Sequence, residues 1–271
     1  MEKRIAVIMS VYRGDEPGRL QEALESLYAQ NPPADIFVQL DGPVAPEIER
    51  LLEKEREAGK IFHLGVRKEN RGLAVSLNEL LDEVLKQGYE YVARMDADDI
   101  SLPGRFEKQC GFMRNHPDID VVGGAIEEFS EDGTYHKIVR YPLRHDEMFD
   151  FFKKRVPLAH VTAFFRRSFF EKAGSYPTTS PTNEDTLLWM RGFVSGCRFA
   201  NIPDTTVRVR VSSGFFGRRG GIEKAFGDLR DRIDVIRTLG YNFDAYFYAF
   251  AVFFVNISPG WLKKILYKRL R

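Results

Sequence analysis

The chain has 271 residues, enough for one large α/β domain or two small ones and for a substantial core. Its 40 basic and 39 acidic residues leave a net charge of +1, which argues against a protein built mainly to bind nucleic acid. The two cysteines, Cys110 and Cys197, lack metal-ligand spacing, so we expect neither a disulfide framework nor a zinc site, and a reducing cytosol fits best.

The first hundred residues alternate short apolar runs with stretches of helical period, a pattern typical of βαβ units and a parallel sheet. The first apolar run is interrupted too soon, at Arg13, to be a secretory signal, so we interpret it as a buried strand. The pattern predicts strands at 5–11, 36–40, 61–66 and 89–94. It also predicts three helices: the first begins at Pro17, the second ends near Ala58, and the third begins at Leu73 and is closed by Gly88.

Beyond Pro103 the pattern is less regular, which indicates mixed topology. In residues 205–211 valine alternates with arginine, which is typical of an edge strand. The other predicted elements are helices near 105–115, 168–173, 184–194 and 222–239, and strands at 121–129, 135–141 and 161–165.

Three aspartates follow the fourth predicted strand in the stretch YVARMDADD. Asp96 and Asp98 stand two apart in an extended segment, so both can address one ligand, and Ala97 between them leaves room for close approach. Their like charges need a cation, and oxygen-only ligands suit Mg²⁺ or Mn²⁺ bridging a diphosphate. The alternative is a solvated turn in which Asp99 caps the following helix.

No glycine-rich phosphate loop precedes these aspartates. The G-x-G-x-x-G fingerprint and the P-loop are both missing, so backbone amides are poor candidates for binding phosphates, and a metal is needed instead. A nucleotidyltransferase usually needs such a loop after its first strand, and the stretch SVYRGDEPG lacks one. This argues against a nucleotidyltransferase, which we keep as an alternative.

Two further acidic positions stand at the ends of predicted elements. Asp41 follows the second strand, either as a ligand of a bound molecule or as part of a turn with Gly42 and Pro43. Glu184 and Asp185 begin a predicted helix, where they either supply a general base or complement the helix dipole.

Basic and titratable residues elsewhere give weaker signals. His160 precedes a predicted strand and is either a structural residue or a contact to acceptor or phosphate. Arg218 and Arg219 lie among glycines, and their guanidinium forks suit phosphate oxygens of the donor or of a lipid diphosphate. The alternative for this pair is a solvated charged loop.

Taken in order, these motifs resemble the inverting family 2 glycosyltransferases of GT-A fold, over about residues 4–220. The resemblance implies an α/β fold with a mixed central sheet and helices on both faces, and a chain divided into 1–221 and a C-terminal helical segment, 222–271. In the first part, 1–100 would bind the nucleotide sugar and 101–221 the acceptor. The motifs that carry the resemblance are IAVIMSVYRGD, VQLDGP, ENRGLAVSLNELL, YVARMDADD and NEDTLLWMRG.

Within the family, the chain looks most similar to bacterial exopolysaccharide transferases of the amylovoran-biosynthesis type, on the stretches ARMDADD, LAHVTAFFRRS and RVRVSSGFFGRRGG. The family resemblance implies that Val11 and Tyr12 line a base pocket and that Asp41 accepts the N3–H of uracil. It also implies that Asn70 and Asn78 face the nucleotide. Many relatives have arginine where this chain has Leu77, so one nucleotide contact differs here.

The resemblance also assigns the catalytic and metal roles. Asp98 would be the direct metal ligand, and Asp96 would reach the ribose or the metal. Asp185 would be the base that activates the acceptor hydroxyl, with Glu184 supporting it or holding the acceptor. Many relatives supply a late histidine to the metal, whereas Ser212 occupies that place here.

The C-terminal tail joins an apolar, aromatic stretch at about 245–257 to a basic segment without acids. The apolar stretch falls short of the roughly 20 residues needed to span a bilayer. Because basic residues follow it, we predict an interfacial segment drawn to anionic lipid. The alternative is a helix pair packed on the domain or on a second subunit.

We therefore expect a metal-dependent, inverting glycosyltransferase that moves a sugar, from a UDP-sugar, to a lipid-linked or oligosaccharide acceptor in surface-polysaccharide biosynthesis. The acceptor would be a saccharide on a polyprenyl diphosphate, and the enzyme would be peripheral on the cytoplasmic face of the cell membrane. The alternative of another class is a non-catalytic sugar-nucleotide-binding or membrane scaffold protein.

Overall fold

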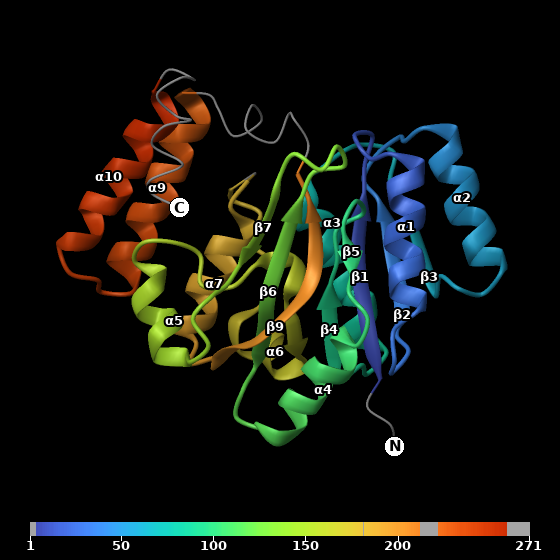
Figure 1. The fold of residues 1–271 in the computed structure, drawn as a ribbon, viewed down its shortest axis with the longest axis horizontal. Helices are drawn as coiled ribbons and strands as arrows, with labels where there is room; N and C mark the ends of the chain where they lie inside the picture. The colour runs from blue at the N-terminus through green and yellow to red at the C-terminus, as the bar shows by residue number, and fades with distance from the viewer. Residues whose placement is uncertain (1–3, 181, 212–221, 259–271) are drawn as a thin grey trace.

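A computed structural model describes residues 4–180, 182–211 and 222–258, and all structural statements below concern these residues. One mixed β-sheet forms the centre, with helices on both faces (Figure 1). The strands are β1 Ile5–Val11, β2 Asp35–Leu40, β3 His63–Val66, β4 Tyr91–Arg94, β5 Ile100–Ser101, β6 Val121–Phe129, β7 His136–Val139, β8 Phe164–Arg166 and β9 Phe199–Arg210. The helices are α1 Pro17–Tyr28, α2 Pro46–Glu57, α3 Leu73–Lys86, α4 Arg105–Asn115, α5 His145–Phe152, α6 Arg167–Ala173, α7 Glu184–Val194, α9 Ile222–Thr238 and α10 Asp244–Ile257.

The strands lie in the order β3-β2-β1-β4-β8-β6-β9-β5, with β7 paired to β6. The first four strands are parallel, as predicted for βαβ units, whereas β8 runs antiparallel to both β4 and β6. The chain order reverses at β1, which lies between β2 and β4. In open α/β sheets this reversal leaves a crevice at the carboxyl ends of the strands, where ligands bind.

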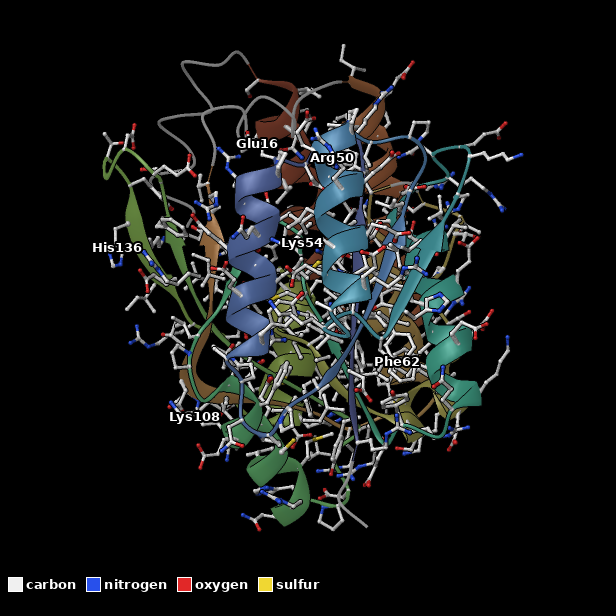
Figure 2. All side chains as sticks on the ribbon, turned by 90° about the vertical axis from the view of Figure 1, so that its right-hand side faces the viewer. Glu16, Arg50, Lys54, Phe62, Lys108 and His136 are labelled. Atoms are coloured by element: carbon white, nitrogen blue, oxygen red, sulfur yellow. The ribbon has the colours of Figure 1, made fainter. Side chains whose placement is uncertain are left out.

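Each face of the sheet is covered by its own set of helices. The odd-numbered side chains of β1 pack with α1, α2 and α4, while its even-numbered side chains pack with α3 in a second core that includes α5, α6 and α7. Figure 2 looks onto the first of these faces, with α1 and α2 side by side in front of the strands. This two-layer burial explains why the parallel strands read as continuous apolar runs.

Most predicted elements match the structure to within about two residues, and two differ from it more. The predicted strands 5–11 and 121–129 and the helix 184–194 have the observed bounds. The predicted strand 161–165 was partly wrong, because His160–Thr162 forms a 3-10 turn and the strand begins at Phe164.

The predicted edge strand 205–211 was also wrong in its position. Residues 205–210 belong to β9, which lies between β6 and β5. A two-residue strand such as β5 leaves no periodic pattern in the sequence. Its pairing with β9 therefore could not be predicted from the sequence. The arginines of β9 do not simply face solvent, since Arg208 and Arg210 pair with glutamates.

The C-terminal helices α9 and α10 form a pair at the end of the molecule opposite α1 and α2 (Figure 1). Helix α9 packs against α7, and its Val235 joins the second core. Within the described residues, none of the helices has both the length and the apolar character needed to span a bilayer. The predicted division at residue 221 and the basic end of the tail lie outside the described residues.

Candidate active site

The predicted acidic residues of the first half gather at the carboxyl ends of β1, β2 and β4. Asp41 directly follows β2, and its N–H donates to the carbonyl of Val11 at the end of β1. The D-x-D sequence begins two residues after β4, which is paired with β1 on its other side. These residues therefore lie at the edge of the sheet where the chain order reverses, which is the place where open α/β sheets commonly bind ligands.

The three aspartates after β4 have three different environments. Asp96 forms an ion pair with the buried Arg94. Asp98 forms no ion pair with any residue that the structure describes, and burial together with the neighbouring charge of Asp96 raises its pKa. Asp99 is buried and accepts a hydrogen bond of 2.8 Å from the N–H of Arg210, so it does not cap α4, whose N-cap is Gly104.

The donor set at this loop fits a divalent cation. Asp98 is a half-buried carboxylate without an ion-pair partner in the described part of the chain, and a bound cation would offset its charge. The described residues contain no cluster of three or more acidic, histidine or cysteine side chains suited to a metal. A metal bound here would therefore take its other ligands from water and phosphate oxygens, as Mg²⁺ commonly does.

Arg94 is a site residue that the sequence reasoning missed. It ends β4, is 4% exposed, and pairs with Asp96. Its positive charge also acts on Glu184 and Asp185 and lowers the pKa of both against the larger opposing effect of burial. The signal was present in YVARMDADD, because strand alternation places residue 94 on the same side as residues 96 and 98.

A second arginine holds the D-x-D loop from the other side. Arg210, at the end of β9, donates through Nε to the carbonyl of Asp98 at 2.9 Å, and its backbone N–H binds Asp99. Its two terminal nitrogens contact Glu22 of α1 and Glu131 at 2.7 and 2.6 Å. Arg210 thus ties the loop to two other parts of the fold.

Replacing Arg210 with alanine should loosen this loop. We expect the free energy of unfolding to fall by about 2 kcal/mol, because buried hydrogen bonds to a charged group are lost while the two glutamates stay half exposed to water. Amide hydrogen exchange over residues 96–101 should also accelerate. Arg208→Ala, which removes a more exposed arginine of the same strand, is the control and should leave that exchange unchanged. Equal exchange in both variants would contradict this role.

Asp41 lies in a dense hydrogen-bond network at 3% exposure. Its carboxylate accepts bonds of 2.8 Å from Arg67 and from the N–H of Arg71, and of 2.9 Å from the N–H of Gly72. Asn70 donates to the carbonyl of Asp41 at 3.1 Å. One lone-pair position of the Asp41 carboxylate is left for a further donor, and Arg67 is a second site residue that the sequence reasoning missed.

The other predicted nucleotide contacts have distinct placements. Val11 is fully buried, whereas Tyr12 beside it is 38% exposed and open to a ligand. Both ends of the Asn78 amide bind the backbone of Tyr176, at 2.9 and 2.8 Å, and its predicted contact to the nucleotide stays a prediction. It thereby joins α3 to the loop that precedes α7.

Glu184 and Asp185 form the first turn of α7, as predicted. Glu184 is 8% exposed, and burial together with the charge of Asp185 raises its pKa to about 7. Burial also raises the pKa of Asp185, although two hydrogen bonds from Thr186 oppose this shift. Both residues also feel the charge of Arg94, and Glu184 that of Asp96, so α7 faces the D-x-D loop.

His160 lies on the same side of the molecule as this carboxylate pair. Its Nε2 shares a hydrogen bond of 3.0 Å with the hydroxyl of Tyr176, and its ring meets Trp189 of α7 edge to face. Burial and the charge of Arg94 hold the pKa of His160 well below its usual range, so the ring is neutral. The structure thus gives it a packing role between the 3-10 turn His160–Thr162 and α7.

Helix α9 holds the start of α7 in place. Asn183, the N-cap residue of α7, donates to Asp228 and Asp231 of α9, both at 2.9 Å. Asp231 also accepts a bond of 2.6 Å from Ser180. The C-terminal segment therefore supports the position of Glu184 and Asp185. Arg218, Arg219 and Ser212 lie outside the described residues.

Comparisons with known proteins agree with this geometry. The sequence profile described as Glycosyl transferase family 2 matches residues 6–174. The amylovoran biosynthesis glycosyltransferase AmsE of Erwinia amylovora is 35% identical over 217 residues, covering 80% of this chain and 79% of that one. The UDP-Gal:alpha-D-GlcNAc-diphosphoundecaprenol beta-1,3-galactosyltransferase of Escherichia coli is 26% identical over 269 residues, covering 98% of this chain and 96% of that one.

Among solved structures, the mannosyltransferase PcManGT from Pyrobaculum calidifontis, in complex with GDP-Man and Mn2+, is similar with a TM-score of 0.62. The match has 17% sequence identity and covers 98% of this chain and 79% of that chain. At this identity the similarity concerns the fold, which is consistent with the predicted GT-A architecture.

Proposed function

Because this chain belongs to glycosyl transferase family 2, we propose that it moves a sugar from a UDP-sugar to a lipid-linked saccharide in surface-polysaccharide biosynthesis, with inversion. The names of two relatives support the donor and acceptor, since one acts on a UDP-sugar and a diphosphoundecaprenol-linked sugar and the other in amylovoran biosynthesis. Such an acceptor would place the reaction at the cytoplasmic face of the membrane.

One observation carries this proposal. Segments about 90 residues apart bring two carboxylates of α7, the buried Glu184 and the half-buried Asp185, and the D-x-D loop around one buried arginine, Arg94. A protein that only binds a nucleotide sugar has no need for this further carboxylate pair beside that site. The pair suits a reaction that removes a proton.

In the proposed single displacement, Asp185 takes the proton of the acceptor hydroxyl as that oxygen attacks the anomeric carbon of the donor sugar. The bond from that carbon to the nucleoside diphosphate breaks on the opposite face, which inverts the configuration. Glu184 helps to hold the acceptor. Arg94 supports the reaction by keeping Asp96 and the carboxylates of α7 in one arrangement.

Donor binding would divide between two parts of the crevice. Tyr12 and Asp41 would take the uracil base, with Asn70 fixing the backbone of Asp41. Asp98, with Asp96, would hold a divalent cation, Mn²⁺ or Mg²⁺, which when bound neutralises charge on the donor diphosphate. The presence of Mn2+ with the sugar nucleotide in the mannosyltransferase supports this assignment.

A screen of nucleotide sugars by thermal stabilisation tests the proposed donor. A ligand that binds only the folded state raises the melting temperature, so a UDP-sugar should stabilise the protein when Mn²⁺ or Mg²⁺ is present and lose most of this effect in EDTA. Stabilisation by GDP-sugars alone would overturn the assignment of uridine. Stabilisation by no nucleotide sugar would overturn the proposed function.

We further infer that α10 rests on a membrane surface. Phe243, Phe247, Phe250, Phe254 and Ile257 are spaced four and three apart, which places them along one face of the helix, and they are 42–75% exposed. A continuous apolar, aromatic face of this kind fits the headgroup boundary of a bilayer. The sequence that follows adds basic residues that favour anionic lipid.

Replacing Phe247 and Phe250 together with serine should weaken binding to vesicles of phosphatidylglycerol and phosphatidylethanolamine by about tenfold or more, because two half-exposed rings no longer enter the lipid. Co-sedimentation at several lipid concentrations measures this. The matched control is Val66→Ser with Val194→Ser, which removes two comparably exposed apolar side chains elsewhere. Equal vesicle binding by both double variants would rule out this surface.

A further inference from the structure

A cavity of about 550 Å³ lies between the start of α7 and the two C-terminal helices. Asp185, the residue proposed as base, lies on its wall. The other described walls come from the segment after α5 and from α9 and α10. Tyr12, Asp41, Asp96 and Asp98 do not line this cavity, which meets the proposed catalytic residues at Asp185.

The cavity has a cationic side. Lys154 and Arg155 are exposed at its rim, and Arg155 forms no ion pair within the described residues. Arg232 of α9 lies deeper, where it donates to the carbonyl of Phe152 at 2.7 Å and its charge acts on Asp185. These three cations suit an anionic group with several oxygens, such as a diphosphate.

The acidic groups of the wall do not cancel this charge. Asp228 is paired with Lys224 at 3.0 Å. Asp231 is buried, and its carboxylate accepts hydrogen bonds from Ser180 and Asn183. Asp185 therefore remains the carboxylate available to a molecule in the cavity, close to cations that would balance it.

The opposite side of the cavity is apolar. Ala249, Val252 and Phe253 of α10 line it, on a face of the helix different from that of Phe247, Phe250 and Phe254. The side chain of Val252 lines the cavity and is 50% exposed, so it is accessible to a bound molecule. An apolar wall beside a cationic rim is suited to an amphiphile with an anionic head.

We propose that this cavity is the acceptor site and that it takes a lipid diphosphate bearing a saccharide. The saccharide end points to Asp185, the diphosphate is bound by Lys154, Arg155 and Arg232, and the first part of the lipid lies against Ala249, Val252 and Phe253. The outer face of α10 then meets the membrane from which the lipid enters. This inference rests on the proposed function in one respect, the role of Asp185 as base.

Farnesyl diphosphate is the probe, because it carries the lipid and the diphosphate without requiring the right sugar. Its binding to the full chain is measured by calorimetry in EDTA. The chelator removes divalent metal, so binding of the diphosphate to a metal at the D-x-D loop does not contribute to the measured heat. Lys154→Ala with Arg155→Ala should weaken binding at least about tenfold, since hydrogen bonds to charged groups are lost. Arg114→Ala with Arg237→Ala removes the same charge from other exposed sites and should have no effect.

A variant and a matched control on the same helix test the apolar wall of the cavity. Val252→Asp should weaken farnesyl diphosphate binding about tenfold or more, whereas Phe254→Asp, on the outer face of the same helix, should not change it. Farnesol, which lacks phosphates, should bind the wild type and the Lys154/Arg155 variant equally. No binding of farnesyl diphosphate to the wild type, or equal losses in the variants and their controls, would overturn the inference.

The two proposals fail in different ways. If no nucleotide sugar stabilises the protein while farnesyl diphosphate binds as expected, the cavity is a lipid-diphosphate site and the transferase assignment is wrong. If a UDP-sugar binds and is turned over, but the substitutions of Lys154, Arg155 and Val252 leave the binding of farnesyl diphosphate unchanged, the inference alone is wrong.

Discussion

Replacing Asp185 with asparagine should reduce sugar transfer by about 100- to 10,000-fold, the usual contribution of a positioned general base. Asparagine keeps the shape of the side chain and its acceptor oxygen for Thr186, so the fold should survive. The loss should appear in kcat, measured with UDP-sugar and acceptor, because the base acts in the chemical step. Donor binding should stay within about twofold of wild type, since the donor is held elsewhere.

The matched control for this variant is Asp234→Asn, an exposed carboxylate of α9, which should leave transfer unchanged. Full activity in Asp185→Asn would remove Asp185 as base. If both the wild type and the variant bind a UDP-sugar but neither transfers it to any acceptor, the non-catalytic binding protein considered from the sequence becomes the better interpretation.

The dependence of the rate on pH follows from the two carboxylates of α7, Glu184 and Asp185. The pKa of Glu184 is raised to about 7 and that of Asp185 is raised above its usual value, so protonation at acid pH removes the charge of the pair. We therefore expect kcat/KM to fall as the pH drops below about 7. In Glu184→Gln the part of this decline that belongs to Glu184 should disappear, while transfer at pH 8 persists.

Replacing Asp98 with asparagine should remove most of the metal-dependent donor binding and lower kcat/KM on the order of 1,000-fold, because a metal commonly supplies several kcal/mol of charge stabilisation. Without a metal, the variant should melt at a temperature equal to or above that of the wild type, because it lacks a half-buried charge that repels the charge of Asp96. A gain in stability with a loss of function is the expected signature of a ligand-binding carboxylate.

Thermal melts of both proteins, with and without Mn²⁺ and a UDP-sugar, measure this prediction, and transfer in EDTA gives the corresponding loss in the wild type. Asp82→Asn, an exposed carboxylate of α3, serves as the control and should behave as wild type. Tight donor binding and full activity of Asp98→Asn in chelator would show that the carboxylate does not hold a metal.

Much of the architecture could be predicted because it depends on local pattern. The bounds of β1, β6 and α7 follow from apolar periodicity and from breaker residues beside them. The gathering of Asp41 and the D-x-D loop follows from a topological rule, that parallel strands end at the same edge of the sheet. The family resemblance rested on the same local motifs, and the sequence comparisons confirm it.

The sequence by itself determined the order of strands and helices in the first half, the acidic motifs at their ends and the family to which they belong. Only the tertiary structure decided which partners those motifs have: Asp99 binds the backbone of Arg210, 111 residues away, and Asn78 binds Tyr176, 98 residues away. Nor could the chain alone reveal that α9 and α10 close a cavity over Asp185. The physical reason is that periodicity and turn chemistry act between near neighbours, whereas ion pairs, burial and cavities depend on the packing of elements far apart in the sequence.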